Sequence, residues 1–389
     1  MTVDTIVYEK NGSLTRIALM GGGDLKEVDI FDNGRAAEGN VYLGKITHKL
    51  ELANGRSGYM IDINDGKDAF LNADENGIGD VEYTNGQSIV VQVAQEQHAE
   101  KGAKVVRSLQ FVGTYLVYCP FRMNIDASGR INDADKLKAL KICVAENTLA
   151  QEGWIIRTAA VEAEMDEIAA EMAELRKTYD AVRAKARVAS APSLLYEKGN
   201  PLFDYMANNA MTLNKVVVNT RNQEAEIRNE FDGDFEVEVM NEPFKSMGLD
   251  ETIADALEKE VRLKSGGRIF IEETKALTAI DVDTGDDRGG GSISRLNEEA
   301  AEEIARQLRL RNISGKIVVD FAGSSEYRYM KPVIEVLERK LAEDSVRAYV
   351  AGLTRAGNIE IVRIRRRPPL SDVMTAECPT CRGTGRVEK

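Results

Sequence analysis

The first 117 residues contain many short β-type runs and no convincing helical periodicity, and this constrains the fold more than any other feature of the sequence. The opening runs IVYEK, LTRIALM and LKEVDIF are separated by an Asn11-Gly12 turn and a glycine turn, which predicts a β-meander. From Gly39 to about Val117 five more runs follow: NVYLGKIT, GYMIDI, DAFL, SIVVQVA and TYLVY. Short strands at this spacing, divided by Gly, Asn and Asp, predict a small barrel.

Helical patterns appear in the sequence only after this region. Apolar residues recur at helical spacing from about Ala134 and most clearly over residues 160–187, and the segment ending at Pro192 stops that helix. The strand-like runs KVVVNT and FEVEVM come next. A further helix is expected near residues 250–261, because its apolar residues would share one face.

The final third alternates between strand-like and helical patterns. RIFIEE and ALTAIDVD are expected as strands, followed by a glycine-rich loop from Gly285 to Ser292 and a helix from Leu296 to Leu310. GKIVVDF then predicts a strand, VIEVLERKLAED a helix and NIEIVRIR a last strand. This alternation is typical of α/β or α+β packing.

Length and charge narrow the class of protein. A chain of 389 residues favours two to four compact units. It has no apolar run near the roughly 20 residues of a membrane span, and MTVDTIVYEKNG lacks the order of a secretory signal, so we expect a soluble, cytoplasmic protein.

The net charge of −13 opposes encounter with a polyanion such as RNA. The charge is segregated, however, because acidic residues crowd residues 161–175 and 228–260. Basic residues stand together near the C-terminal end, at Arg363, Arg365, Arg366 and Arg367. Such a basic patch, together with bound divalent cations, would still permit a phosphate ligand.

Three aspartates on predicted strands are the candidate catalytic residues. Asp281 and Asp283 lie two residues apart, so on a strand they share one face, and Asp320 closes another apolar strand. Carboxylates at the ends of buried strands are costly unless compensated, and Mg²⁺ prefers oxygen ligands. A divalent ion there suits phosphodiester hydrolysis. The alternative is that these aspartates cap turns or pair with nearby arginines.

The four cysteines fall into two kinds. Cys119 and Cys143 have apolar surroundings and are expected to be plain buried thiols. Cys378 and Cys381 have metal-ligand spacing, although one CxxC cannot fill a tetrahedral zinc site, so two protomers would have to share the ion. The alternatives are a redox-active dithiol, which would want the motif to open a helix, or a metal-free turn.

Longer stretches of the sequence resemble the ribonuclease E/G family. The similarity is carried by SGGRIFIEETKALTAIDVDTG, NEEAAEEIARQLRLRNISGKIVVDF and CPTCRGTG, and by the earlier blocks GNVYLGKIT, KGAKV, GTYLVYCP and GWIIRTAA. These blocks occur in collinear order over nearly the whole chain, which is far more specific than any single motif.

This resemblance implies an endoribonuclease that cleaves single-stranded RNA hydrolytically, leaving 5′-phosphate and 3′-hydroxyl ends, in RNA processing and decay. It implies that Asp281 and Asp320 bind Mg²⁺ or Mn²⁺. Asp283 stands where the family has a supporting Asn, a departure that bears on the number of bound ions and their affinity.

The resemblance also implies a pocket for the 5′-monophosphate of the substrate, which stimulates cleavage. Its positions fall on Gly113, Val117, Arg157, Thr158 and Arg347. Arg offers a forked donor for phosphate oxygens, Thr adds a hydroxyl, and Gly lets backbone amides approach closely. For Arg157 alone the alternative is a surface salt bridge.

An RNA-binding barrel is implied in the same way. Phe70 matches a position where the family stacks a base on an aromatic ring, whereas Met60 and Ile63 occupy two other such positions, so weaker or less base-selective binding is expected. The candidate contacts to the RNA backbone are Lys45, Lys49 and Lys101.

The implied fold class is α+β with several subdomains. An RNase H-like subdomain carries an inserted OB-type barrel and a 5′-sensor region, and a DNase I-like catalytic subdomain and a C-terminal zinc-link follow. The RNase H-like subdomain is expected to comprise two segments, 1–38 and 191–255. The other expected boundaries are 39–115 (OB-type barrel), 116–190 (5′-sensor region), 256–374 (DNase I-like) and 375–389 (zinc-link).

The resemblance further implies that Cys378 and Cys381 share a structural Zn²⁺ with a second protomer. The chain stops eight residues after Cys381, which favours a homodimer over a tetramer. Two alternatives to a ribonuclease stay open. One is a non-catalytic RNA-binding or scaffold protein that keeps the nuclease fold, and the other is a metal phosphatase or DNase.

Overall fold

A computed structural model describes most of the chain. The described residues are 2–52, 55, 57–73, 82–97, 101–129, 131–231, 233–285, 293–323, 326–381, 383, 385 and 387. The chain divides into two compact units. Unit 1 comprises Met1–Phe31 and Thr212–Lys389, and unit 2 comprises Asp32–Met211.

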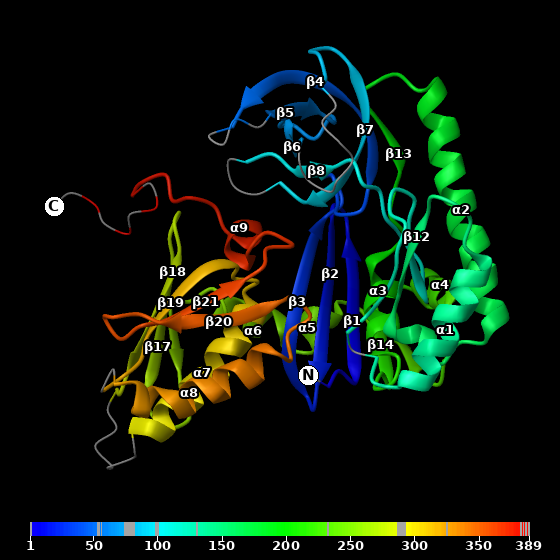
Figure 1. Ribbon diagram of the computed structural model, residues 1–389. Coiled ribbons are helices and arrows are strands. Elements are labelled where there is room, and N and C mark those ends of the chain that lie inside the picture. Colours follow the sequence, from blue (N-terminus) through cyan, green and yellow to red (C-terminus); the bar gives the residue numbers. More distant parts are fainter. Residues whose placement is uncertain are drawn as a thin grey trace. The chain divides into compact units, whose positions relative to one another are not determined.

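The first sheet of unit 1 has five strands in the order β15-β14-β1-β2-β3 (Figure 1). The antiparallel N-terminal strands confirm the predicted meander, and β14 pairs in parallel with both β1 and β15. The strands are β1 (Thr5–Asn11), β2 (Leu14–Gly21), β3 (Asp24–Asp32), β14 (Lys215–Val218) and β15 (Glu236–Val239). The helices beside them are α4 (Arg221–Glu230), α5 (Pro243–Ser246) and α6 (Leu249–Asp255).

The second sheet of unit 1 has six strands in the order β16-β17-β18-β19-β21-β20. They are β16 (Glu260–Arg262), β17 (Arg268–Glu273), β18 (Thr278–Asp283), β19 (Gly315–Asp320), β20 (Ala348–Leu353) and β21 (Ile359–Arg363). The helices of this region are α7 (Ile293–Leu310), α8 (Tyr327–Leu341) and the short α9 (Leu370–Met374).

Only one face of this second sheet is covered by helices in the described portion of the chain. Alternate strand residues such as Ile280, Val282 and Val319 pack with the buried stripes of α7 and α8 in one apolar core. Figure 1 shows the two helices lying along the same side of the strands. Because side chains alternate along a strand, the intervening residues face the other side, which we call the open face.

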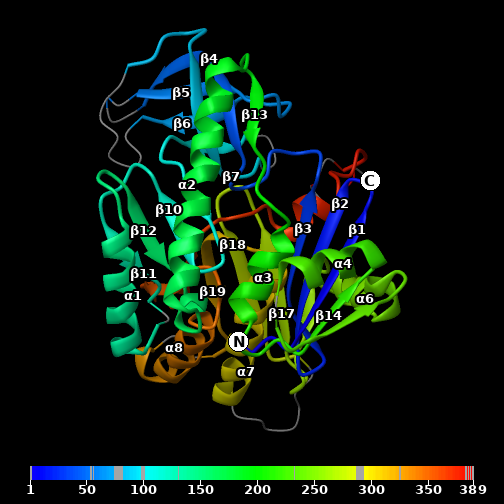
Figure 2. The ribbon, with the colours of Figure 1, turned by 90° about the vertical axis from the view of Figure 1, so that its right-hand side faces the viewer.

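A closed barrel forms the beginning of unit 2 and confirms the predicted barrel. Its strands pair in the ring β4-β5-β6-β8-β7, and β7 pairs back to β4 (Figure 2). A further strand, β13, pairs with the first residues of β4. The strands are β4 (Val41–Glu51), β5 (Ser57–Asp62), β6 (Ala69–Asn72), β7 (Ser88–Gln95), β8 (Lys104–Val106) and β13 (Ser193–Tyr196).

The rest of unit 2 is a four-stranded sheet with helices. The strand order is β11-β12-β10-β9, and the buried rings of Trp154, Phe111 and Tyr118 lie at the centre of its core. The strands are β9 (Phe111–Val112), β10 (Leu116–Cys119), β11 (Ile125–Ala127) and β12 (Gly153–Ile156). The helices are α1 (Ala134–Asn147), the 3-10 helix η1 (Thr158–Val161), α2 (Met165–Val188) and α3 (Pro201–Asn209).

Two sequence expectations about these elements were wrong. The helix expected near residues 250–261 ends at Asp255, and residues 260–262 form β16 instead. Polar and apolar residues alternate there, so Val261 packs toward the sheet core while Arg262 stays exposed. The run TYLVY does not join the barrel either, because β10 belongs to the four-stranded sheet.

Several elements had no predicted counterpart. They include β12, β13, β20, α3 and α4, although the Thr220–Gln223 capping box that starts α4 is a readable signal in the sequence. Among the helices in the described ranges, none combines the length and apolar character that crossing a membrane requires.

Candidate active site

Asp281 and Asp320 lie directly opposite each other on neighbouring strands. β18 and β19 run in parallel, and their register pairs Asp281 with Asp320. Both residues are exposed, whereas the preceding residues Ile280 and Val319 are buried. The two carboxylates therefore stand on the open face of the sheet, on strands that lie about 4.8 Å apart.

This placement corrects one premise of the sequence analysis. We expected the carboxylates to need compensation because they would be buried, but both side chains reach solvent. Burial still contributes most to the raised pKa of Asp281, and the neighbouring negative charges of Asp320 and Asp283 raise it further. Burial and these two neighbouring carboxylates thus disfavour the ionised form of Asp281 on this face.

Asp283 shares the face of Asp281, but its side chain has a local partner. Its carboxylate accepts a hydrogen bond of 2.6 Å from the backbone N–H of Gly285. The described residues include no cluster of three or more His, Cys, Asp or Glu side chains placed to hold a metal ion. Most of the glycine-rich loop expected from Gly285 to Ser292 lies outside the described residues, at 286–292.

Four of the five residues proposed for the 5′-phosphate pocket lie in unit 2. The Arg157 guanidinium donates to the carbonyl of Gly113 and to Asn208 Oδ1 at 3.2 Å, and it lies 3.6 Å from Asp204. Thr158, the next residue, donates from its hydroxyl to Ser128 at 3.2 Å. Arg157 is thus held in place on three sides rather than extended into solvent.

The loop that contains Gly113 is fixed by a single carboxylate. Glu171, on α2, accepts hydrogen bonds from the backbone N–H groups of Thr114, Tyr115 and Leu116. Burial raises the pKa of Glu171, and the three N–H donors act against that rise. Val117 follows directly on β10, so Glu171 also positions the start of that strand.

Arg347 belongs to unit 1, unlike the other four residues of the predicted pocket. Its guanidinium lies 5.7 Å from the centre of the Tyr349 ring. This is cation–π distance.

The outer surface of the barrel carries a row of four side chains that the strand register places side by side. His48 pairs with Met60, Met60 with Phe70, and Phe70 with Lys104. Phe70 and Met60 were expected here from the sequence, whereas His48 and Lys104 were not. Its third family position, Ile63, is 1% exposed and belongs to the barrel core, so it does not contribute to this row.

Lys45 and Lys101 are both exposed on the same unit, as expected for contacts to an RNA backbone. Lys49 is already paired, with its ammonium 2.8 Å from Glu82.

The arginine cluster near the C-terminal end is not the basic surface patch that its sequence suggested. Arg363 is 2% exposed and pairs with the buried Asp344 at 2.8 Å. Arg367 pairs with Asp29 at 2.6 Å, and Arg365 donates to Ser314. Two of the four arginines therefore hold the fold of unit 1 together, because each satisfies a carboxylate removed from water.

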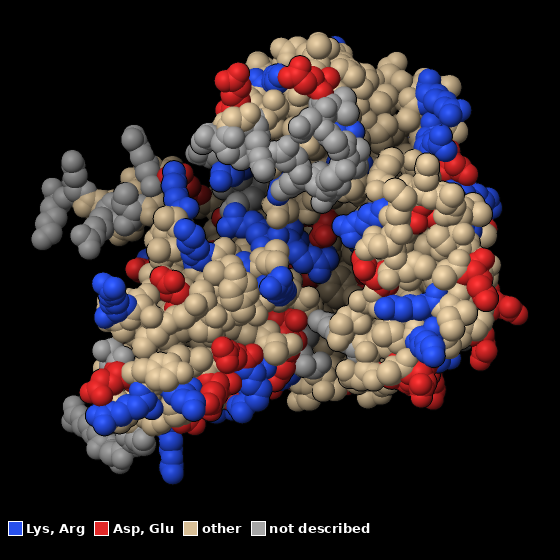
Figure 3. Space-filling model, viewed as in Figure 1, with Lys and Arg blue, Asp and Glu red and all other residues tan. Residues whose placement is uncertain are grey.

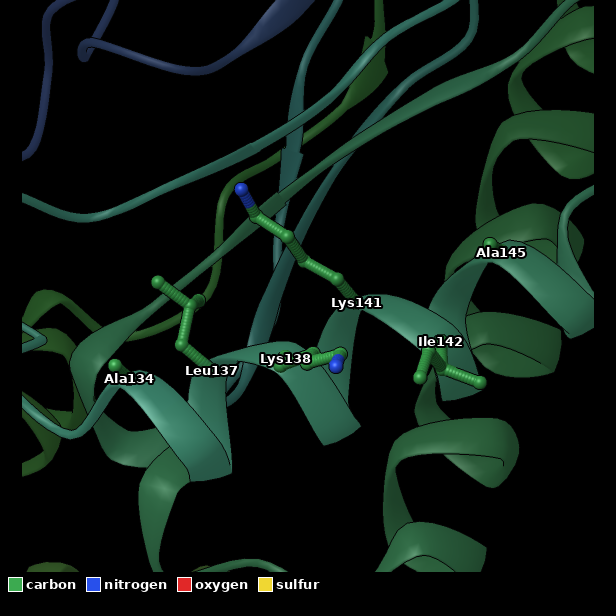
Figure 4. A pocket seen from close by; sticks show the side chains of 6 residues that line it. All are labelled: Ala134, Leu137, Lys138, Lys141, Ile142 and Ala145. Carbon is green, nitrogen blue, oxygen red and sulfur yellow. The ribbon is translucent and has the colours of Figure 1, made fainter.

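The drawn face is nonetheless not uniformly acidic. Figure 3 shows some basic side chains gathered together on this face, while elsewhere basic and acidic side chains lie beside one another. A shallow hollow of about 410 Å³ lies along α1 and is lined by residues that include Lys138, Lys141 and Ile142 (Figure 4). None of the predicted site residues lines this hollow.

The expectation of two buried thiols is confirmed for Cys119 and only partly for Cys143. Cys119 is buried and Cys143 is half-buried, whereas Cys378 is exposed. Hydrogen bonds from the backbone N–H groups of Cys381 and Thr380 lower the pKa of the Cys378 thiol. A lowered thiol pKa favours the thiolate, which is the form that binds metal ions.

Comparison with known proteins assigns the chain to a class. Residues 110–366 match the Ribonuclease E/G family. Ribonuclease G of Escherichia coli (strain K12) is 31% identical over 424 residues, which cover 100% of this chain and 85% of that protein. Ribonuclease G of Haemophilus influenzae is 32% identical, over 96% of this chain and 82% of that protein. Ribonuclease E of Escherichia coli (strain K12) is 31% identical, over 96% of this chain and 38% of that protein.

These relatives define the class as ribonucleases. The chain belongs to the ribonuclease E/G family, so both the resemblance seen in the sequence and the expected enzyme class, an endoribonuclease, are confirmed.

Proposed function

We propose that this protein cleaves single-stranded RNA hydrolytically, leaving 5′-phosphate and 3′-hydroxyl ends, in RNA processing and decay. The observation that carries this proposal is the pairing of two exposed carboxylates, Asp281 and Asp320, on the open face of a sheet in a member of the ribonuclease E/G family.

Asp281 and Asp320 would hold Mg²⁺ or Mn²⁺. The donors fit a hard divalent cation, because both offer carboxylate oxygens to solvent. Burial raises the pKa of Asp281, and the negative charges of Asp320 and Asp283 raise it as well, so a bound cation would relieve this repulsion. Such an ion, when bound, polarises a phosphoryl oxygen and activates water. Asp283 would assist from the same face, and its hydrogen bond to Gly285 would hold the start of the glycine-rich loop beside the site.

A separate pocket would bind the 5′-monophosphate of the substrate and stimulate cleavage. Arg157 and Thr158 supply a guanidinium and a hydroxyl, and the loop at Gly113 and Val117 is rigidly held by Glu171. A phosphate would compete with Asp204 for Arg157, and its higher charge would favour it over the single carboxylate. Arg347 is the fifth residue that the resemblance assigns to it.

The barrel would bind the RNA chain. The row His48, Met60, Phe70 and Lys104 combines an aromatic ring for a base with basic groups for the backbone, and exposed Lys45 and Lys101 lie on the same unit. With Phe70 as its one phenyl ring, the row is expected to bind RNA weakly and with little sequence preference.

We assign the subdomains by the family resemblance. Residues 39–115 would be the OB-type barrel, residues 1–38 and 191–255 the RNase H-like subdomain, and residues 116–190 the 5′-sensor region. Residues 256–374 would be the DNase I-like catalytic subdomain. The closed barrel, the five-stranded sheet and the helix-backed six-stranded sheet support this division.

Cys378 and Cys381 would bind a structural Zn²⁺ together with the same pair from a second protomer, giving a homodimer. The lowered pKa of Cys378 supports a thiolate ligand. Native mass spectrometry should then give a dimer with one zinc per two chains. Cys378→Ser should give monomers without zinc, and a dimer that survives in this variant would contradict the assignment.

The cleavage test uses one oligoribonucleotide with either a 5′-monophosphate or a 5′-hydroxyl, with and without Mg²⁺. The parent protein should cut both only with Mg²⁺, and should cut the monophosphorylated form faster. Arg157→Gln should remove this difference without slowing cleavage of the 5′-hydroxyl form, whereas the control Arg183→Gln, at an exposed ion pair on α2, should keep it. RNA binding without any cleavage would refute the proposed cleavage and would favour a non-catalytic scaffold protein.

A further inference from the structure

The open face of the six-stranded sheet carries three further side chains beside the carboxylate pair. Phe270, on β17, lies directly opposite Asp281, which itself lies opposite Asp320. Two residues away on the same strand, Arg268 lies opposite Asp283 on one side and opposite Arg262, on the edge strand β16, on the other. We call Arg262, Arg268 and Phe270 the β16–β17 strip.

Two arginines placed directly opposite each other on adjacent strands are unfavourable for the fold. Like charges in this position repel and destabilise the pair of strands. The side chain of Arg262 is 86% exposed, and its only ion pair within the described residues is with Glu260 at 3.4 Å. The guanidinium of Arg268 lies 5.9 Å from the Phe270 ring centre and has no carboxylate at ion-pair distance among the described residues.

The position of Phe270 is also unexplained by packing. An aromatic residue on a sheet usually packs against apolar neighbours across the strands. Here the neighbours in the same row are charged, with Glu260 on one side and Asp281 on the other. The ring is only partly buried, whereas the adjacent Ile269 and Ile271 fill the core. The ring thus presents a surface to solvent next to the carboxylate pair.

We propose that the β16–β17 strip binds one or two nucleotides of single-stranded RNA next to the bond that is cut. The Phe270 ring stacks the base, and the guanidinium groups of Arg268 and Arg262 bind the adjoining phosphates. Stacking on one ring accepts any base, and a guanidinium binds phosphate through paired donors. The strip rests on the proposed ribonuclease function, because it would orient the chain toward Asp281 and Asp320.

This arrangement gives the acidic face a means of holding a polyanion. Without it, three carboxylates at Asp281, Asp283 and Asp320 would repel the incoming phosphates. Arg268 lies on β17, next to the strand of Asp283, and Arg262 lies on the edge strand β16 beyond it. The two arginines therefore place positive charge along one side of the carboxylates. The strip therefore fixes the direction in which RNA crosses this face.

The test measures RNA binding apart from cleavage. The protein carries Asp281→Asn and Asp320→Asn to prevent cutting, and fluorescence anisotropy follows a 5′-hydroxyl oligoribonucleotide over a series of salt concentrations. On this background the strip variants are Arg262→Gln, Arg268→Gln and Phe270→Leu. The matched controls are Arg328→Gln and Tyr329→Leu on α8, an exposed arginine and tyrosine with cation–π geometry on the covered side.

Each arginine variant should reduce the slope of log K against log salt by about 0.7, the value for one lost contact to a single-stranded phosphate. Phe270→Leu should leave the slope unchanged and weaken binding by about 5- to 100-fold. An abasic nucleotide at the contacted position should remove this effect of Phe270→Leu. The two controls should change neither the slope nor the affinity.

The proposed role of the β16–β17 strip is refuted if all three variants bind RNA as the controls do. This result is distinguishable from failure of the proposed function. A parent protein that cuts RNA, with strip variants equal to the controls, refutes only the strip. A parent that binds RNA but never cuts it, with strip variants that lose binding, refutes only the nuclease.

Discussion

Unit 1 contains two pairs of charged residues with opposite surroundings: one pair is buried and the other is exposed. Asp344 and Arg363 form a pair that is almost fully removed from water, with an N–O distance of 2.8 Å. Asp281 and Asp320 form a pair of like charges that lie opposite each other on an exposed face. The first pair stabilises the fold and offers nothing to a ligand, while the second costs stability and is open to one.

The comparison shows that the partner, not the residue type, decides what a charged side chain does. The four arginines at 363–367 formed the most basic segment of the sequence, yet Arg363 and Arg367 neutralise Asp344 and Asp29 inside unit 1. Arg262 and Arg268, which stand apart in the sequence, become neighbours through strand pairing.

The largest effect is expected from breaking the buried pair. Asp344→Ala should lower the free energy of unfolding by about 3–5 kcal/mol, because Arg363 is left buried without its carboxylate. Urea unfolding measures this loss. Replacing both residues, as Asp344→Leu with Arg363→Met, should recover much of it. A loss below about 1 kcal/mol for the single variant would show that the pair does not hold the fold.

Removing a member of the exposed pair should change activity and leave stability intact. Asp281→Asn or Asp320→Asn should slow cleavage by about a hundred- to a thousandfold, since binding of the ion is worth several kcal/mol in the transition state. The free energy of unfolding should stay within about 0.5 kcal/mol of the parent, or rise as repulsion is relieved. The control is Glu272→Gln, one row away on the same face and paired with Lys259. Cleavage at the parent's rate by either Asn variant would refute the site.

The buried network should also respond to pH. Burial, together with the nearby negative charges of Asp29 and Asp344, raises the pKa of Glu27 to about 7, whereas the unfolded chain has the usual value near 4.5. Above about pH 4.5 the unfolded state therefore ionises Glu27 first, and stability should fall as pH rises toward about 7, by at most about 1.4 kcal/mol per pH unit.

Urea unfolding at several pH values tests this against Glu27→Gln. The variant lacks the titrating group, so its stability relative to the parent should grow between about pH 4.5 and 7 and then level off. An identical pH dependence in both proteins would mean that Glu27 is ionised in the fold at neutral pH.

The smallest effect is expected from an exposed pair of opposite charges. Lys331 and Glu335 on α8 are 3.8 Å apart, with side chains 60% and 64% exposed. Lys331→Ala should change the free energy of unfolding by less than about 0.5 kcal/mol, because solvent screens the attraction. A change above about 1 kcal/mol would mean that an exposed ion pair also stabilises the fold, so that burial is not what distinguishes Asp344 and Arg363.

Local pattern was enough to predict much of the fold. Alternation predicted the N-terminal strands and the barrel, and helical spacing predicted α7 and α8. It failed at residues 260–262, where a three-residue strand follows a short helix and the window for either periodicity is small. It also missed β20, whose polar and apolar residues are all partly exposed or exposed.

Long-range pairing was beyond the sequence. The residues Asp281 and Asp320 could be named, but the parallel register that sets them opposite each other spans a helix and 39 positions of the chain. The contact of Asp344 with Arg363 likewise joins a loop after α8 to β21, 19 positions along the chain. Both contacts depend on which segments pack together, a property of the folded chain and not of any local segment. Arg268 and Arg262, by contrast, pair across two consecutive strands, and this pairing was not predicted because a helix was expected there.

Binding of Mn²⁺, followed by electron paramagnetic resonance, tests the carboxylate pair most directly. The parent protein should bind Mn²⁺ at the open face, and the variant with both Asp281→Asn and Asp320→Asn should lose that binding while keeping the parent's unfolding free energy. The Zn²⁺ proposed for Cys378 and Cys381 would be diamagnetic and would not interfere. Equal Mn²⁺ binding by the parent and the double variant would contradict the assignment of Asp281 and Asp320 as the metal ligands.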